Sequence, residues 1–428
     1  MQVRKSITWG AALAAASLAL SACAGGGPGP SSGDGSLTVW MMTGGPGDNP
    51  VIEEAISALK QAHPEAEVKV EIQQWDEIVT RLTTALASDD PPDIVEMGNT
   101  QTPLFTYSGA LAQLDPAGFE RSDEWLEGLS ALTTYDGNTY AAPLYGGTKI
   151  VMYNRAKFAE AGISEPPTTL DELLADCDAL AAANAGVPNF SPLYMPGEYW
   201  FAGVPFLFGK GGELATQTDG QWTAQMSSPE NIAGLQAWRA FQNGCSPVPS
   251  SRTANTDSPD QDRIFADRNS AMIYMRAWER GAVLEMDPSL EPDLGYFIMP
   301  GYTEGAPLPV IIAGSTIGVA QNSPNQELAT DFLHILTSES FQKSMTSAIN
   351  QLPIVPGFLP TDAPEHIRLG AQAATVSRPV PSSPGQATLE NEQFNEKFFA
   401  RIASGDDPVA AAAAYDTHAT ETLNALGD

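Results

Sequence analysis

The sequence predicts a two-lobed α/β protein, and three observations support this prediction. Segments with strand periodicity and segments with helix periodicity alternate from residue 37 to residue 98, which indicates a parallel sheet with right-handed crossovers. The chain of 428 residues is longer than one hydrophobic core usually supports, so two lobes are expected. Apolar residues make up 43% of the chain, which favours a globular fold over disorder.

The first 36 residues are expected to direct export and anchoring. Two cations, Arg4 and Lys5, precede a short apolar run, which is the pattern of a secretory signal. Residues 20–23, Leu-Ser-Ala-Cys, resemble the bacterial lipobox, in which the signal is cut before the cysteine and the thiol is lipidated, with palmitate among the acyl chains. We therefore predict a signal peptide over residues 1–22, a lipid anchor on Cys23 that holds the protein on the outer face of the cell membrane, and a flexible tether over residues 23–36. An ordinary signal peptide with an incidental cysteine is the alternative.

The charge balance excludes some partners. The chain carries 21 basic and 52 acidic residues, a net charge of −31, and removal of the two cations in the signal makes it −33. Such an acidic protein is not expected to bind nucleic acid or an anionic membrane surface, and self-repulsion favours a monomer. Two cysteines remain in the mature chain. Cys177 and Cys245 either pair, as exported cysteines often do, or Cys177 is a buried free thiol on the apolar face of its helix.

The first predicted lobe can be followed element by element. Its strands are expected at residues 37–40, 68–72 and 93–97, since these short segments are rich in β-branched and other apolar residues. Between them, residues 49–63 and 76–88 carry apolar side chains at helical spacing, and the first helix has Asn49 and Pro50 at its start.

Polar and aromatic residues follow each of these strands. Ligands collect beyond the carboxyl ends of parallel strands, and a sugar places its C–H faces on aromatic rings while amides and carboxylates bind its hydroxyl groups. We therefore expect a sugar site there. Its first-lobe candidates are Trp40, Thr43, Trp75, Asp76, Glu96, Asn99 and Gln101. The alternative for Trp40 and Trp75 is burial in the core.

The rest of the chain resembles a known family. The segments that carry the resemblance are TYAAPLYGGTKIVMYNRAKFAEAGI (139–163), FADRNSAMIYMRAWERG (265–281), AGSTIGVAQNSPNQELATDFLHIL (313–336) and QLPIVPG (351–357). They are similar, in the same order, to family 1 extracellular solute-binding proteins, the maltose-binding-protein type that serves ABC importers. EMGNTQ (96–101), EWLEGL (124–129) and SRPVPSSPG (377–385) are similar to actinobacterial binding proteins for N-acetylglucosamine and chitobiose.

The resemblance implies the fold and its division. It implies a periplasmic-binding-protein-like fold, in which each lobe has a mainly parallel sheet flanked by helices and the ligand cleft lies between the lobes. The first lobe is then expected over residues 37–147 and 307–353, and the second over residues 148–306 and 354–428. A hinge is expected near residues 145–150.

The resemblance also implies further site residues. Trp278 falls in the family's second-lobe cleft motif, together with Glu279, and Trp200 is a candidate partner unless it packs beside Phe206 in the core. The remaining candidates are Tyr145, Gly314 and Ser315. Two departures bear on the sugar: Ala313 stands where the family often has glycine, and Lys149 where it often has arginine, which binds hydroxyl groups differently.

The function expected is capture of a sugar and its delivery to the permease of an ABC importer. The rival is a lipid-anchored glycosidase, which needs two carboxylates facing one bond, and 52 acidic residues leave such a pair open. The four histidines are scattered, no His/Cys cluster has metal spacing, and no phosphate-binding loop is present, so neither a metal nor any other cofactor is expected and no residue is assigned as catalytic.

Overall fold

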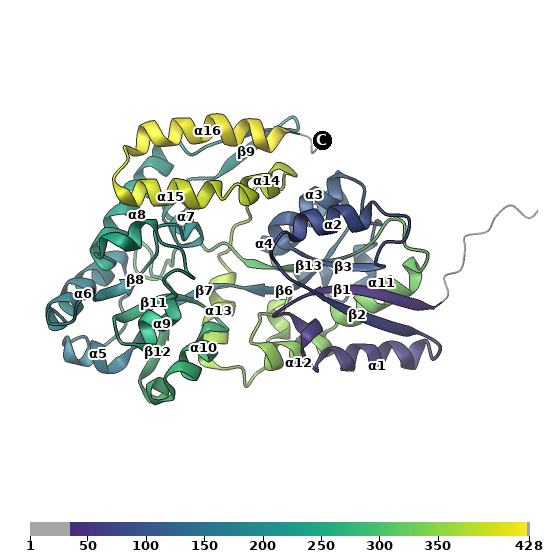
Figure 1. Cartoon of the computed structure of the whole chain (residues 1–428), viewed down its shortest axis with the longest axis horizontal. Helices are drawn as coiled ribbons and strands as arrows, with labels where there is room; N and C mark the ends of the chain where they lie inside the picture. The colour runs from purple at the N-terminus through teal and green to yellow at the C-terminus, as the bar shows by residue number, and fades with distance from the viewer. Residues whose placement is uncertain (1–34, 426–428) are drawn as a thin grey trace, which may run out of the picture.

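The computed structural model describes residues 35–425 and confirms a two-lobed α/β architecture. The predicted signal peptide, Cys23 and nearly all of the predicted tether lie outside the described residues. Figure 1 shows the first sheet on the right and the second on the left, with β6 and β7 leading from one to the other. Between residues 35 and 425, no helix is both long enough and apolar enough to cross a bilayer.

The first sheet has five strands in the order β2-β1-β3-β13-β6. The strands are β1 (Ser36–Met42), β2 (Glu67–Gln73), β3 (Ile94–Gly98), β6 (Ala142–Gly147) and β13 (Ala313–Val319). The helices near this sheet are α1 (Ile52–Ala62), α2 (Ile78–Leu86), α3 (Thr102–Tyr107), α4 (Glu127–Ser130), α11 (Gln326–Leu336) and α12 (Glu339–Ile349), and a small hairpin joins β4 (Thr134–Tyr135) to β5 (Asn138–Thr139).

The second sheet has four strands in the order β12-β7-β11-β8. The strands are β7 (Lys149–Asn154), β8 (Ser191–Tyr194), β11 (Ser270–Arg276) and β12 (Leu294–Phe297), and a separate hairpin joins β9 (Ala215–Thr218) to β10 (Gln221–Ala224). The helices that follow are α5 (Arg155–Glu160), α6 (Leu170–Ala183), α7 (Trp200–Gly209), α8 (Pro229–Cys245), α9 (Gln261–Ala266), α10 (Glu279–Met286), α13 (Glu365–Ala374), α14 (Gly385–Asn391), α15 (Phe394–Ser404) and α16 (Pro408–Asn424). Short 3-10 helices include η1 (Pro46–Asp48), η2 (Asn99–Gln101), η5 (Pro249–Thr253), η6 (Pro288–Asp293) and η7 (Pro356–Phe358).

Both sheets are mixed, whereas we expected mainly parallel ones. β1 pairs in parallel with β2 and β3, as the alternating pattern predicts, but β13 is antiparallel to both β3 and β6. In the second sheet only β8 and β11 are parallel. The physical reason is the path of the chain. β13 returns from the second lobe, so it enters the first sheet at the carboxyl ends of β1–β3 and runs against them.

Side-chain alternation places an apolar layer on each face of both sheets. In β1, Val39 and Met41 face one core while Met42 faces another, and in β7 Val151 and Met152 are divided in the same way. Helices cover both layers, so the sheets are buried on both faces. The predicted lobe boundary at residues 353 and 354 stays a prediction, because Ile354 belongs to the first core whereas α13 packs beside β7.

Cys177 and Cys245 form a disulfide, which is the first of the two alternatives that the sequence left open. Cys177 on α6 and Cys245 at the end of α8 are bonded, with their Cα atoms 5.3 Å apart. Both residues are fully buried in the core of the second lobe, so the bridge joins two helices that cover the same sheet.

Candidate functional site

The two sheets meet at the segment from Tyr145 to Lys149, which we call the crossing segment. It contains the last residues of β6 and the first of β7, so both sheets present their ends to it. β1–β3 run toward it from the first lobe, and β11 ends opposite Lys149 in the register of the second sheet. The candidate site is therefore built around this segment.

A buried carboxyl group anchors the first-lobe side. Glu96 on β3 accepts hydrogen bonds from the Tyr145 hydroxyl at 2.9 Å and from the Met42 amide at 2.9 Å. Burial raises the pKa of Glu96 to about 7, although these two bonds and the neighbouring Ser315 hydroxyl oppose the rise. The group thus joins β1, β3, β6 and β13 at one point. A side chain at Gly45 would lie within 3.3 Å of the Tyr145 hydroxyl, so the glycine allows the loop after β1 to approach this group.

Trp75 offers an exposed ring at the same edge. It follows β2 by two residues, its ring is 39% exposed, and its indole N–H donates to the carbonyl of Thr43 at 3.1 Å. The Thr43 hydroxyl in turn donates to Asp48. Asp76, the next residue in the chain, is exposed. The structure therefore brings Thr43 and Trp75 together and fixes the ring from its nitrogen edge.

Asn99 and Gly314 position backbone at the site. The Asn99 amide donates to the carbonyl of Ile312 at 3.0 Å, and its oxygen accepts from the Gly314 N–H at 3.1 Å. A Cβ at Gly314 would lie 2.3 Å from the carbonyl oxygen of Tyr145. Both residues lie near the crossing segment, but their polar groups already bind within the protein, and their role in ligand binding stays a prediction.

The second lobe contributes Trp278 and an ion pair beside it. Trp278 precedes α10, its ring is 42% exposed, and it lies 3.7 Å from the Cβ position of Gly147 in the crossing segment. The Arg276 guanidinium stands 5.0 Å from the centre of this ring. Glu279 is buried and accepts from Arg276 at 2.8 Å and from Gln261 at 3.0 Å. Glu279 therefore holds Arg276 in place, and Trp278 presents an open face.

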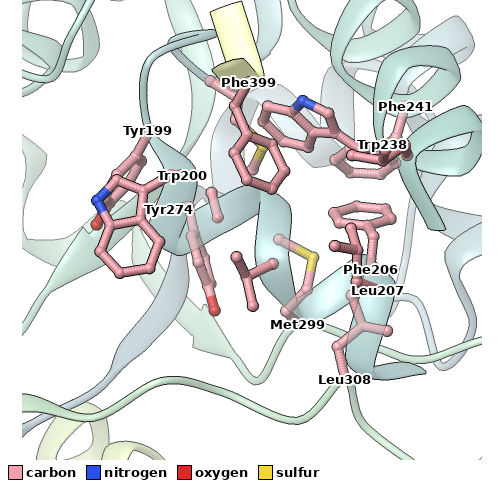
Figure 2. Packing of buried hydrophobic residues seen from close by; sticks show 14 of the residues in the cluster. Tyr199, Trp200, Phe206, Leu207, Trp238, Phe241, Tyr274, Met299, Leu308 and Phe399 are labelled. Atoms are coloured by element: carbon pink, nitrogen blue, oxygen red, sulfur yellow. The ribbon is translucent and has the colours of Figure 1, made fainter. Parts of the chain in front are cut away.

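Trp40 and Trp200 belong to the cores, which is the alternative that the sequence left open. Trp40 packs against the layer formed with α2, and its indole donates to Glu71 at 3.0 Å. Trp200 is 3% exposed, and its ring centre lies 4.1 Å from that of Phe201. Figure 2 shows Trp200 beside Tyr199, in the same buried cluster as Trp238.

Several buried polar atoms near the crossing segment have no partner among the described residues. The ammonium of Lys149 lies 3.8 Å above the ring of Phe201 without a hydrogen bond, and burial, helped by the charge of Arg276, lowers its pKa to about 7. The other unpartnered atoms are Gln101 Oε1, Tyr199 Oη, Tyr274 Oη and Gln351 Oε1. Buried polar groups are nearly always satisfied, so this concentration indicates a place for a ligand or water with many hydroxyl groups.

Lys149, Gln351 and Tyr274 were not among our predicted site residues. The sequence signals only Lys149, through its departure from the family pattern. Gln351 reaches the site through the fold: its side-chain oxygen lies 3.3 Å from the Cβ position of Gly147.

The C-terminal helices supply a wall that the sequence also failed to indicate. α14 packs against both η2 and α3 of the first lobe, and we call this contact the interlobe seam. At one end of the seam, the Glu390 carboxyl accepts a hydrogen bond from Thr100. Burial raises the pKa of Glu390 to about 7, whereas this bond lowers it. The seam therefore joins the lobes beside the predicted residue Gln101.

Among residues 35–425, no group of three or more His, Cys, Asp or Glu side chains is arranged to hold a metal ion. The candidate site offers two exposed tryptophans, Trp75 from the first lobe and Trp278 from the second, and buried hydrogen-bonding groups near the crossing segment. This arrangement can hold a polar ring-shaped molecule.

The comparisons with known proteins agree with this geometry. Residues 44–343 match the family model described as bacterial extracellular solute-binding protein. The diacetylchitobiose binding protein DasA of Streptomyces coelicolor is 32% identical over 381 residues, which are 88% of this chain and 87% of that protein.

Two solved structures share the fold. The sugar-binding protein MalE from Xanthomonas citri superposes with a TM-score of 0.78 at 20% identity, covering 91% of this chain and 97% of that one. The GacH receptor of Streptomyces glaucescens gives 0.71 at 19% identity over 92% and 99%.

Proposed function

Because the chain belongs to the family of bacterial extracellular solute-binding proteins, we propose that it binds a carbohydrate between its lobes and delivers it to the permease of an ABC importer. The observation that carries the proposal is the set of unpartnered buried polar atoms near the crossing segment, Gln101 Oε1, Lys149 Nζ and Gln351 Oε1, together with the exposed residues Trp75 and Trp278. The similarity to a diacetylchitobiose binding protein favours a disaccharide of N-acetylglucosamine as the ligand.

The proposed mechanism is capture by two lobes that approach each other. One sugar face lies on the Trp75 ring, and closure about the crossing segment brings the Trp278 ring toward another. Gln101, Lys149 and Gln351 then donate to or accept from the hydroxyl and acetamido groups, which removes the cost of leaving these buried groups unpaired. Closure is favoured only by contacts that differ between the open and closed states. Micromolar affinity corresponds to about −8 kcal/mol, which suits an importer.

The proposal includes binding without cleavage. Glu96 has a pKa raised to about 7, as a general acid would need, but its carboxyl group already accepts hydrogen bonds from Tyr145 and Met42. A glycosidase would also need a second carboxylate across the bond.

The experiment is retention of labelled diacetylchitobiose by the purified chain, followed by chromatography of the released label. Recovery of intact disaccharide, with maltose retained far more weakly, is the expected result. Release of N-acetylglucosamine in proportion to protein and time would establish the glycosidase instead, and failure to retain any disaccharide would refute the proposal.

We also propose that lipid on Cys23 anchors a monomer to the outer face of the cell membrane. The support is the Leu-Ser-Ala-Cys motif at residues 20–23, followed by a Gly/Ser/Pro-rich segment. In cells fed a labelled fatty acid, Cys23→Ala should abolish incorporation of label into the protein, while Cys177→Ala should leave it unchanged. Equal labelling of the Cys23→Ala variant contradicts the anchor.

A further inference from the structure

A cavity of about 590 Å³ lies between the lobes at the far end of the interlobe seam. Its first-lobe wall is Tyr107 at the end of α3 and the β4–β5 turn with Tyr135 and Asp136. Its second-lobe wall is the β9–β10 hairpin with Trp222, the loop at Pro384 before α14, and the end of α16. The volume falls in the range of small-molecule sites, about 300–1,000 Å³.

The seam separates this cavity from the crossing segment. The C-terminal turn of α14 meets η2 through the hydrogen bond between Glu390 and Thr100. The N-terminal end of α14, at Pro384, lies at the cavity together with Tyr107, the last residue of α3. Hence α14 and the η2–α3 segment run side by side in opposite directions, and the seven residues of α14 place about 10 Å of helix between the two sites.

The cavity wall combines exposed rings with free polar groups. Tyr107 and Tyr135 are 37% and 40% exposed, and their ring centres lie 4.7 Å apart in an edge-to-face arrangement. Trp222 is half-buried on the opposite lobe. The side chains of Asp136, Gln217 and Gln221 also line the cavity, and none of them hydrogen-bonds to another residue in the described range 35–425.

These features together select one ligand chemistry. Aromatic rings next to amide and carboxylate groups fit a pyranose, whose C–H faces are apolar and whose hydroxyl groups pair with planar polar side chains. The net charge of −31 and the carboxylate of Asp136 disfavour an anionic sugar.

We propose that this cavity is a second carbohydrate site, which binds an uncharged mono- or disaccharide against both lobes. A ligand that touches both walls binds best to one relative position of the lobes. It therefore changes affinity at the crossing segment, and the ligand there changes affinity in the cavity by the same factor. The proposal does not depend on which sugar occupies the crossing segment.

The test is equilibrium dialysis of the mature chain against a panel of labelled disaccharides (diacetylchitobiose, maltose and cellobiose), from micromolar to millimolar concentration. For at least one sugar we expect binding that Tyr135→Ala weakens at least tenfold and that Tyr135→Phe retains. Trp278→Ala should leave this binding at least partly intact while weakening binding at the crossing segment. The melting temperature of each variant shows that it is folded.

The possible outcomes separate the two proposals. Saturation at one molecule per chain for every sugar, with no effect of Tyr135→Ala, overturns the second site and leaves the proposed function standing. The absence of any Trp278-dependent binding of diacetylchitobiose refutes the proposed ligand, while binding that depends on Tyr135 would still establish the cavity as a site. If binding at one site left the affinity of the other site unchanged, the coupling between the two sites would be refuted.

Discussion

Replacing Trp278 by alanine should separate binding from stability. The ring is 42% exposed, which for an indole side chain leaves about 100 Å² that a sugar can cover. At about 25 cal/mol per Å², covering that surface contributes up to about 2.5 kcal/mol, so affinity should fall on the order of 10- to 100-fold. Because the ring lies at the edge of the second lobe and not in its core, we expect the melting temperature to change little.

Calorimetric titration with diacetylchitobiose and a thermal melt of the same preparation measure both quantities. The matched control is Trp238, which is fully buried in the second-lobe core. Trp238→Phe should lower the melting temperature and leave the affinity of the folded protein nearly unchanged. If Trp278→Ala instead lost several kcal/mol of stability and kept its affinity, the ring would be a structural residue and the assignment of the site would be wrong.

Three further predictions concern the disulfide, the interlobe seam and a glycine at the crossing segment. The double variant Cys177→Ala/Cys245→Ala removes a bridge that spans 68 residues of sequence, and chain-entropy arguments give a loss of about 4 kcal/mol in urea denaturation; a loss below about 1 kcal/mol would contradict this. Because burial raises the pKa of Glu390 to about 7 from its ordinary 4.5, the protonated group stabilises the fold at low pH, and this contribution is lost as pH rises from about 4.5 through about 7. As pH rises over that range, the free energy of unfolding of Glu390→Gln should therefore increase relative to that of the wild type, by on the order of 1 kcal/mol because the carboxyl group is partly exposed. Parallel curves of unfolding free energy against pH for the two proteins would refute the linkage. Gly314→Ala places a Cβ 2.3 Å from the carbonyl oxygen of Tyr145 and should cost about 1–3 kcal/mol in thermal unfolding; Gly281→Ala, on α10 with no atom within 4 Å of the added Cβ, should be neutral or stabilising, and equal effects would contradict the steric argument.

The two tryptophans that we predicted at first-lobe strand ends, Trp40 and Trp75, show how far sequence reasoning reaches. Both were predicted to face a ligand, with burial in the core as the alternative. Trp40 lies inside β1, opposite Glu71 of β2, so the pleat directs its ring into the layer beneath α2. Trp75 lies two residues beyond the last residue of β2, where no neighbouring strand constrains it. To predict that Trp40 is buried and Trp75 exposed, one must know where each strand ends to within two residues, and sequence patterns do not give strand ends that accurately.

The β-α-β-α-β order of the first lobe was predictable because its contacts are local in sequence. The antiparallel position of β13 was not, because it depends on pairing with β3 and β6, more than 150 residues away along the chain. Glu390 and Gln351 escaped prediction for the same reason, since each reaches the site only through contacts between distant segments. Glu96 and Trp278 were predictable, because each follows or lies within a recognisable strand.

The central position of β13 has a consequence for how the chain acquires its structure during synthesis. β3 and β6 have no hydrogen-bonded contact with each other, and β13 alone joins them in the sheet of the described chain. A nascent chain that has emerged only to residue 300 already contains β1, β2, β3 and β6, but β3 presents an open edge and β6 lacks its partner strand. Open strand edges are templates for pairing with other chains. The first lobe, although it begins the sequence, is therefore completed after the strands of the second, and the partly emerged chain is the form most exposed to aggregation and most in need of a chaperone.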